Sequence, residues 1–267
     1  MEIKGENFEQ PSVIAVNSKG QIAVVDYDEH CILITDKEGN CVRKMGCYGN
    51  SAGQLNSPLD VTYLNDDTNI LAADQCNHRI QQFNVQTGNS VKSFGKEGTR
   101  GREFQNPASF FVDEEGRVIV ADYNNNRMQV LSQDGQPLFQ FGDSGPEKVN
   151  KPTACIYHEN KFIVSDWGNY CLKVFDNTGK FLYKIGEKGK GDGQLKGPHG
   201  LCLQKCGNRH NLLVCNSLNG RVDQFTVEGC FTGKTVVKLQ DPTRITTTPD
   251  GLILVTDFNT KKIHILK

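Results

Sequence analysis

The sequence predicts an all-β fold, a six-bladed β-propeller of four-stranded antiparallel blades. Two observations carry this prediction. Six prolines recur along the 267 residues at intervals of 44 to 49 residues, a period typical of propeller or solenoid repeats. After each proline, an apolar run ends in an aspartate or, once, an asparagine. The prolines are Pro11, Pro58, Pro107, Pro152, Pro198 and Pro242, and the polar residues are Asp26, Asp74, Asp122, Asp166, Asn216 and Asp257.

The unit at 107–142 displays the pattern of a single blade most clearly. Four short apolar segments, PASFFV, VIVA, MQVL and PLFQF, are separated by turns at 115–116, 123–126 and 134–135 that are rich in glycine, asparagine and aspartate. Short strands joined by tight turns form an antiparallel meander, which is too small to bury both of its faces alone. A closed ring of such sheets buries them, because each blade packs on two neighbours.

Six units account for the chain as one propeller, with blades at about 11–57, 58–106, 107–151, 152–197, 198–241 and 242–267. The last unit stops after its third strand. We therefore expect residues from about Met1 to Lys4 to close the ring by pairing with the strand at 263–266, or the last blade to have three strands. The fifth unit lacks the aspartate, and we expect a longer turn from Lys205 to Asn211.

Composition excludes several functional classes. The 30 basic and 31 acidic residues give a formal charge of −1, so any basic binding surface is local. No apolar run is long enough to span a membrane, and the polar start MEIKGENFEQ is not a signal peptide, so we expect a soluble, cytoplasmic protein. The ten cysteines are expected to be reduced and metal-free, because closely paired Cys-x-x-Cys ligands are absent from the sequence.

The repeated aspartates are expected to be architectural. Each one lies where a strand enters a tight turn, so its carboxylate can accept hydrogen bonds from the amides of that turn. Basic residues follow the aspartate position in four units, at Arg79, Arg127, Arg221 and Lys262. We expect these cations to pair with carboxylates at the blade junctions, and some of them to face a ligand as well.

The position immediately after the aspartate is expected to be functional. Four of the six units place an aromatic ring there, and the residues at this position are Tyr27, Gln75, Tyr123, Trp167, Ser217 and Phe258. Equivalent repeat positions project to one side of a propeller, so these rings share a face with the blade linkers. That face also carries basic residues, whereas the turns of the other face are acidic. Exposed rings beside cations can stack on bases or dock a peptide, although they can also simply cover the blade ends.

Two segments resemble a known repeat. AADQCNHRIQQF and VADYNNNRMQVL are similar to the NHL motif, in which Ala-Asp is followed by x-x-Asn-x-Arg and an apolar strand, and linkers such as GTRGREFQNP resemble those of the same family. The first unit departs from the motif at Asp28-Glu29-His30-Cys31. The resemblance implies a C-terminal domain of a TRIM-NHL protein, whose other domains are a RING, B-boxes and a coiled coil. It also implies recognition of RNA or protein partners in a ubiquitin ligase or translational regulator.

The leading hypothesis is an RNA-recognition module of a post-transcriptional regulator, and the alternative is a protein-binding scaffold for substrate recognition in a ubiquitin ligase. An enzyme resembling the amidating lyases, which also use NHL-type propellers, would need several histidine ligands converging on the central channel, and only His199 is placed to line the channel mouth. We therefore expect a non-catalytic domain without cofactor or metal. The candidate RNA-binding residues are Tyr27, Arg79, Tyr123, Arg127, Trp167, His199, Arg221, Arg244, Phe258 and Lys262.

Overall fold

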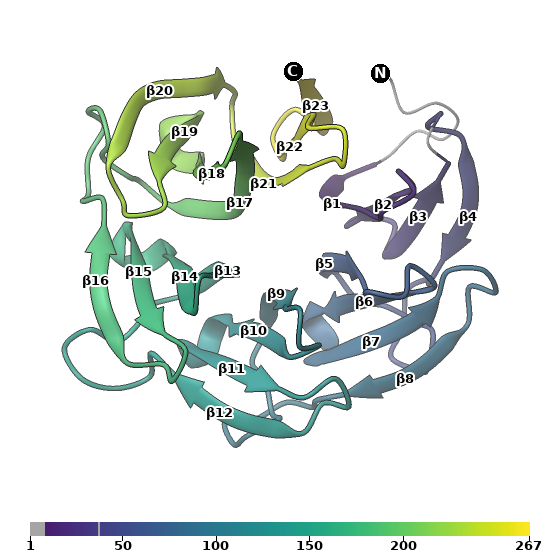
Figure 1. Ribbon diagram of the computed structural model, residues 1–267. Helices are drawn as coiled ribbons and strands as arrows, with labels where there is room; N and C mark the ends of the chain where they lie inside the picture. The colour runs from purple at the N-terminus through teal and green to yellow at the C-terminus, as the bar shows by residue number, and fades with distance from the viewer. Residues whose placement is uncertain (1–8, 37) are drawn as a thin grey trace.

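The computed structural model describes residues 9–36 and 38–267. Six antiparallel sheets stand around a central channel, and in each of them the first strand lies innermost (Figure 1). The predicted all-β, six-bladed propeller is confirmed. Each sheet begins at one of the six repeated prolines, which pairs across the sheet with the aspartate or asparagine that ends the second strand, as Pro58 does with Asp74. The repeated proline, which begins the first strand, and the repeated aspartate or asparagine, which ends the second, therefore lie at the same end of each blade.

The first three sheets each contain four strands. Blade one comprises β1 (Pro11–Val16), β2 (Ile22–Asp26), β3 (Cys31–Thr35) and β4 (Cys41–Met45). Blade two comprises β5 (Pro58–Tyr63), β6 (Asn69–Asp74), β7 (Arg79–Asn84) and β8 (Ser90–Phe94). Blade three comprises β9 (Pro107–Val112), β10 (Val118–Asp122), β11 (Arg127–Leu131) and β12 (Pro137–Phe141).

The remaining sheets complete the ring. Blade four comprises β13 (Pro152–His158), β14 (Lys161–Asp166), β15 (Cys171–Asp176) and β16 (Phe181–Ile185). Blade five comprises β17 (Pro198–Cys206), β18 (Arg209–Asn216), β19 (Arg221–Thr226) and β20 (Phe231–Lys238). Blade six comprises β21 (Pro242–Thr247), β22 (Ile253–Asp257) and β23 (Lys262–Leu266). Single 3-10 turns follow the second strands of blades two to five, at η1 (Gln75–Asn77), η2 (Tyr123–Asn125), η3 (Trp167–Asn169) and η4 (Ser217–Asn219).

The hydrophobic core lies between the blades. One cluster of buried apolar side chains fills each junction, because alternate residues of a strand face opposite neighbours. In β1, Val13 and Ala15 pack toward blade two, whereas Ile14 packs toward blade six. Glycine is required where a linker turns onto the core: Gly95 has φ +100°, and a Cβ there would lie 2.5 Å from the Phe104 ring. The repeat thus specifies both the strands and the blade contacts.

Strand pairing answers two questions about the expected blades: the length of the turn in blade five and the number of strands in blade six. The segment from Lys205 to Asn211 is not a long turn, because β17 and β18 continue to pair as far as Cys206 and Arg209. Blade six has three strands within the described residues, and β1 lies beside it, with the Thr256 hydroxyl donating to the Ser12 carbonyl at 3.0 Å. The predicted closure by residues 1–4 lies outside the described residues.

The propeller has two unlike faces. The first, called here the linker face, is formed by the blade-to-blade linkers and the turns that join second to third strands. The second, the opposite face, is formed by the turns that join first to second and third to fourth strands. The pairing of Pro58 with Asp74, at one end of blade two, places the linker and the η1 turn together on the linker face.

Candidate nucleic-acid interface

In five of the six blades an aspartate ends the second strand, and it fastens the linker that precedes its own blade. Asp74 accepts a hydrogen bond from the backbone N–H of Asn56 at 2.7 Å, and Asp122 accepts one from Gln105 at 2.8 Å. Blades one, four and six repeat this contact. In blades two to four the carboxylate also accepts a hydrogen bond from its own turn, as expected, but the donor is the side-chain amide of an asparagine: Asn77, Asn125 and Asn169 donate at 2.9, 2.9 and 2.8 Å. Each carboxylate therefore ties its own turn to the linker that passes beside the strand end.

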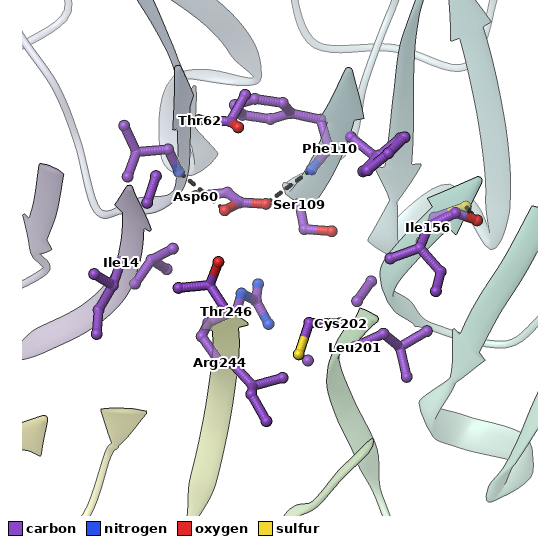
Figure 2. A pocket seen from close by; sticks show the side chains of 18 of the residues that line it. Ile14, Asp60, Thr62, Ser109, Phe110, Ile156, Leu201, Cys202, Arg244 and Thr246 are labelled. Atoms are coloured by element: carbon purple, nitrogen blue, oxygen red, sulfur yellow. Dashed lines mark hydrogen bonds between the residues drawn. The ribbon is translucent and has the colours of Figure 1, made fainter. Parts of the chain in front are cut away.

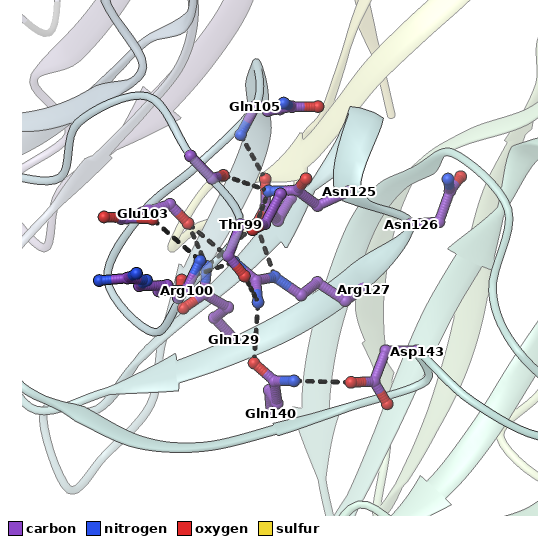
Figure 3. A network of polar contacts seen from close by, with 12 residues as sticks. Thr99, Arg100, Glu103, Gln105, Asn125, Asn126, Arg127, Gln129, Gln140 and Asp143 are labelled. Carbon is purple, nitrogen blue, oxygen red and sulfur yellow. Dashed lines mark hydrogen bonds and ion pairs between the residues drawn. The ribbon is translucent and has the colours of Figure 1, made fainter.

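Arg127 completes the fastening in blade three (Figure 3). Its Nε lies 2.8 Å from the Asp122 carboxylate, and its two terminal nitrogens donate to the backbone carbonyls of Thr99, Arg100 and Glu103 and to the side chain of Gln140. All five N–H groups of the guanidinium are thereby used, and the side chain is only 5% exposed. Arg127 therefore stabilises the linker and has no donor left for a phosphate.

The other basic residues of the repeat lie in similar or peripheral places. Arg79 pairs with Asp74 at 2.7 Å and donates to the carbonyls of Ser51 and Gln54. Arg221 pairs with Asp223 at 2.7 Å. The expected pairing with the repeated aspartate is present for Arg79 and Arg127, whereas Asp223, the partner of Arg221, lies outside the repeated position. Lys262 is exposed at the start of β23, where it pairs across the sheet with Asp257.

The six residues that follow the aspartate position converge on one pocket of the linker face. Tyr27, Gln75, Tyr123, Trp167, Ser217 and Phe258 all line a cavity of about 380 Å³, called here the aromatic cup. The four rings are half-buried, and those of Tyr27 and Phe258 meet edge to face, with their centroids 6.4 Å apart. The rings thus surround the channel mouth and leave room for a ligand between them.

His199 and Arg244 also line the cup. The Nη1 of Arg244 and the Nδ1 of His199 are 2.6 Å apart. Burial and the charge of Arg244 hold the pKa of His199 well below its usual range, so the imidazole is neutral and its unprotonated Nδ1 accepts the hydrogen bond. Six of the ten candidate residues, Tyr27, Tyr123, Trp167, His199, Arg244 and Phe258, are therefore brought together, whereas Arg79, Arg127, Arg221 and Lys262 lie outside the cup.

Two lysines, Lys151 and Lys188, lie beside aromatic rings on one side of the linker face. The ammonium of Lys151 lies 5.6 Å from the centroid of the Tyr123 ring and 5.9 Å from that of Trp167. Lys188 lies 4.5 Å from the centroid of the Tyr170 ring. Tyr170 and the half-exposed Leu218 of the cup were not among the expected site residues. Aligned repeats could have revealed both, since they occupy turn positions where the other units have smaller or more polar residues.

The histidines do not form a metal site. No group of three or more His, Cys, Asp or Glu side chains suited to a metal occurs among the described residues. His30 and His78 instead use Nδ1 to accept the backbone N–H of Ser57 and Asn106, at 2.9 and 3.1 Å. No disulfide bond joins any of the ten cysteines in the part of the chain that the structure describes, and no helix there is long and apolar enough to cross a membrane.

Comparison with known sequences identifies the repeat. The NHL repeat model matches residues 55–83 and 104–131, and a model described as a 6-bladed beta-propeller matches residues 148–219. The chain is 34% identical to the Protein brain tumor of Drosophila melanogaster over 138 residues, which cover 51% of this chain and 13% of that protein. It is 49% identical to Protein lin-41 of Caenorhabditis elegans over 45 residues, which cover 17% of this chain and 4% of that protein. It is 29% identical to the E3 ubiquitin-protein ligase TRIM71 of Xenopus tropicalis over 141 residues, which cover 46% of this chain and 16% of that protein. The chain thus matches only a small part of each relative.

Solved structures support the architecture. Virginiamycin B lyase from Staphylococcus aureus superimposes with a TM-score of 0.72 at 16% identity, covering 98% of this chain and 82% of that one. A streptogramin B lyase gives a TM-score of 0.70 at 15% identity, covering 97% and 83%. At this identity the likeness concerns the fold and does not transfer the lyase activity.

Proposed function

The chain is a six-bladed propeller that carries NHL repeats and resembles the C-terminal domain of TRIM-NHL proteins, and from this premise we propose that it binds single-stranded or stem-loop RNA on its linker face. In this proposal the domain is a recognition module within a longer cytoplasmic protein and performs no catalysis itself. The convergence of Tyr27, Tyr123, Trp167 and Phe258 on one cup is the observation that carries the proposal.

Aromatic rings at a channel mouth suit unpaired bases. Every base has a π-face, and stacking on a protein ring contributes about 1–3 kcal/mol per base. The rings here are half-buried and line the cup, so their neighbours hold them in place while part of each ring stays accessible. A flexible strand that crosses the linker face can therefore place bases against several blades at once.

Cations for the phosphates come from the linkers. Lys151 already lies beside the Tyr123 and Trp167 rings, and Lys188 and Lys196 follow in the next linker. Arg79, Arg127 and Arg221 are assigned to holding these linkers, because their guanidiniums donate to buried carboxylates and linker carbonyls. The proposed RNA contacts are thus the rings of the cup, with Arg244 and His199 at its base and the linker lysines at its rim.

The test is RNA affinity of the purified domain, measured by fluorescence anisotropy with a labelled single-stranded pool at two salt concentrations. Tyr123→Ala or Trp167→Ala should each weaken binding about tenfold, since each removes one stacking platform. Glu114→Lys adds positive charge on the opposite face and should change affinity little. Circular dichroism should confirm that the three variants are folded.

Salt separates RNA binding from the rival function. RNA affinity should fall steeply with salt, because phosphate contacts release counterions, whereas a largely apolar peptide contact should not. If the wild-type domain shows no salt-sensitive RNA binding, or if both ring substitutions leave it unchanged, the proposal fails. The cup is then better explained as a scaffold surface that docks a protein, as substrate recognition in a ubiquitin ligase requires.

A further inference from the structure

One charged layer crosses the central channel below the aromatic cup. The residues two positions after the repeated prolines form a ring around the channel, and they are Val13, Asp60, Ser109, Ala154, Gly200 and Arg244. Four of them are apolar or small, one is acidic and one is basic. A Cβ on Gly200 would lie 2.8 to 3.1 Å from backbone atoms of β21, so only glycine allows the two inner strands to pack this closely.

Arg244 is held rigidly in this layer. Its Nη1 meets His199 at 2.6 Å, and its Nη2 donates to the Ala108 carbonyl at 2.9 Å, so a side chain of blade six is fixed to blades five and three. Arg244 is 8% exposed, and its Nε has no hydrogen-bond partner within the described residues. One donor of a buried guanidinium is thus left unsatisfied, which costs free energy.

Asp60 faces Arg244 from blade two (Figure 2). Its two carboxylate oxygens accept the backbone N–H groups of Val61 and Phe110, each at 2.9 Å. No hydrogen bond or ion pair joins Asp60 to Arg244 in the part of the chain that the structure describes. Burial raises the pKa of Asp60 to about 6, against the attraction of Arg244, and burial lowers the pKa of Arg244. Each charge therefore lacks a partner close enough to offset its loss of water.

A cavity of about 280 Å³ adjoins the two charges. The inner strands of all six blades line it, with apolar walls that include Ile14, Ile156 and Leu201 and with hydroxyls at Ser109 and Thr246 (Figure 2). The cup is lined by the first residues of these strands, whereas this cavity is lined by later ones and so lies toward the opposite face. Its volume lies just below the usual range for sites of drug-sized ligands, which suits a smaller molecule.

We propose that this channel cavity binds a small zwitterion, such as a free amino acid, with its ammonium group at Asp60 and its carboxylate at the Nε of Arg244. Such a ligand neutralises both buried charges at once. A simple anion would leave Asp60 without a partner, and a simple cation would meet the charge of Arg244. The inference does not rest on RNA binding, because Asp60, Ser109 and Thr246 line the channel cavity and are absent from the cup.

Calorimetric titration with glycine, β-alanine and γ-aminobutyrate tests the proposal on the unmodified domain. These three probes carry the same two charges at increasing separation, and at least one should bind saturably. Acetate and methylamine, each of which retains one charged end, should bind at least tenfold more weakly than the best zwitterion. No saturable binding by any zwitterion, or equal binding by acetate or methylamine, would overturn the proposal and leave a channel occupied by water.

Asp60→Asn provides the matched variant. It removes the charge that receives the ammonium group, so zwitterion affinity should fall at least tenfold. Asp250→Asn removes the same charge from the opposite face at a position outside the channel cavity, and should leave the affinity unchanged. Asp60→Asn should also retain RNA binding, so failure of this inference and failure of the RNA proposal are separable. Equal zwitterion affinity of folded Asp60→Asn and wild type would contradict the assignment.

Discussion

Blades two and five fasten their linkers with the same pair of side-chain groups, a carboxylate and an amide, but the two groups have exchanged positions. In blade two, the carboxylate of Asp74 ends the second strand, and the amide of Gln81 donates to it at 3.0 Å from seven residues further on. In blade five, the amide is that of Asn216 at the strand end, and it donates at 2.8 Å to the carboxylate of Asp223, seven residues further on. In both blades the amide also donates to the carbonyl of a linker glutamine.

The exchange indicates that blades two and five need the same set of groups at this place, one carboxylate and one side-chain amide, but that either of the two positions can supply either group. The cation follows the carboxylate in both cases, since Arg79 and Arg221 place Nε 2.7 Å from Asp74 and Asp223, respectively. Blade four varies the set again: Cys171 replaces the arginine, and Lys173 supplies the charge 3.1 Å from Asp166. One buried carboxylate and one adjacent cation are thus common to blades two to five.

The largest expected effect comes from breaking one such set. Arg127→Ala leaves the Asp122 carboxylate buried without its cation and removes a hydrogen bond from each of three linker carbonyls. Removing one partner of a buried ion pair destabilises a protein by about 3–5 kcal/mol. Urea unfolding followed by circular dichroism measures the change in the free energy of unfolding. Lys92→Ala, which breaks the exposed pair with Asp134, serves as control and should cost no more than about 1 kcal/mol. Equal losses in the two variants would contradict the structural role of Arg127.

A smaller effect tests the exchange itself. Asn216→Asp alone places two carboxylates side by side, and Asp223→Gln alone leaves Arg221 without its anion, so each should destabilise the domain by about 2 kcal/mol. The double variant restores the pattern of blade two. It should be more stable than either single variant, with a coupling energy of about 0.5–3 kcal/mol. Additive losses in urea unfolding would show that the two blades are not interchangeable.

Sequence reasoning reached the fold because the repeat marks strand boundaries. The prolines and aspartates recur at the same blade end, and their spacing alone defines six sheets. It also placed Tyr123 and Trp167 on one face, since equivalent positions project to one side, and the structure shows that both line the aromatic cup. It assigned the arginines a possible ligand contact because sequence spacing does not reveal that the linker backbone folds back onto them, as it does onto Arg127.

The charged channel layer escaped sequence reasoning for a different reason. Asp60 and Arg244 occupy the same repeat position in different units, where neither residue belongs to the NHL motif. A motif search looks for residues that all the units share. This layer is instead defined by two charged residues at a position where the other four units have apolar or small residues. Aligning the six units at the residue two positions after the proline would have exposed it.

Blade six offers the smallest test of the comparison. His264 occupies the position of Gln81, but its Nε2 is 3.9 Å from the Asp257 carboxylate and is buried without a hydrogen-bond partner among the described residues. His264→Gln would provide an amide at the place from which Gln81 reaches Asp74, so we expect a gain of about 1 kcal/mol in the free energy of unfolding.

His264→Leu is the matched control, because blade one has Leu33 at this position and Asp26 there accepts backbone N–H groups from residues 9 and 10. Leucine removes the unsatisfied nitrogen but adds no hydrogen bond, so in urea unfolding the glutamine variant should be the more stable of the two. If leucine stabilises as much as glutamine, the benefit comes from removing a buried polar atom. The amide of the repeat would then be dispensable in blade six, as it is in blade one.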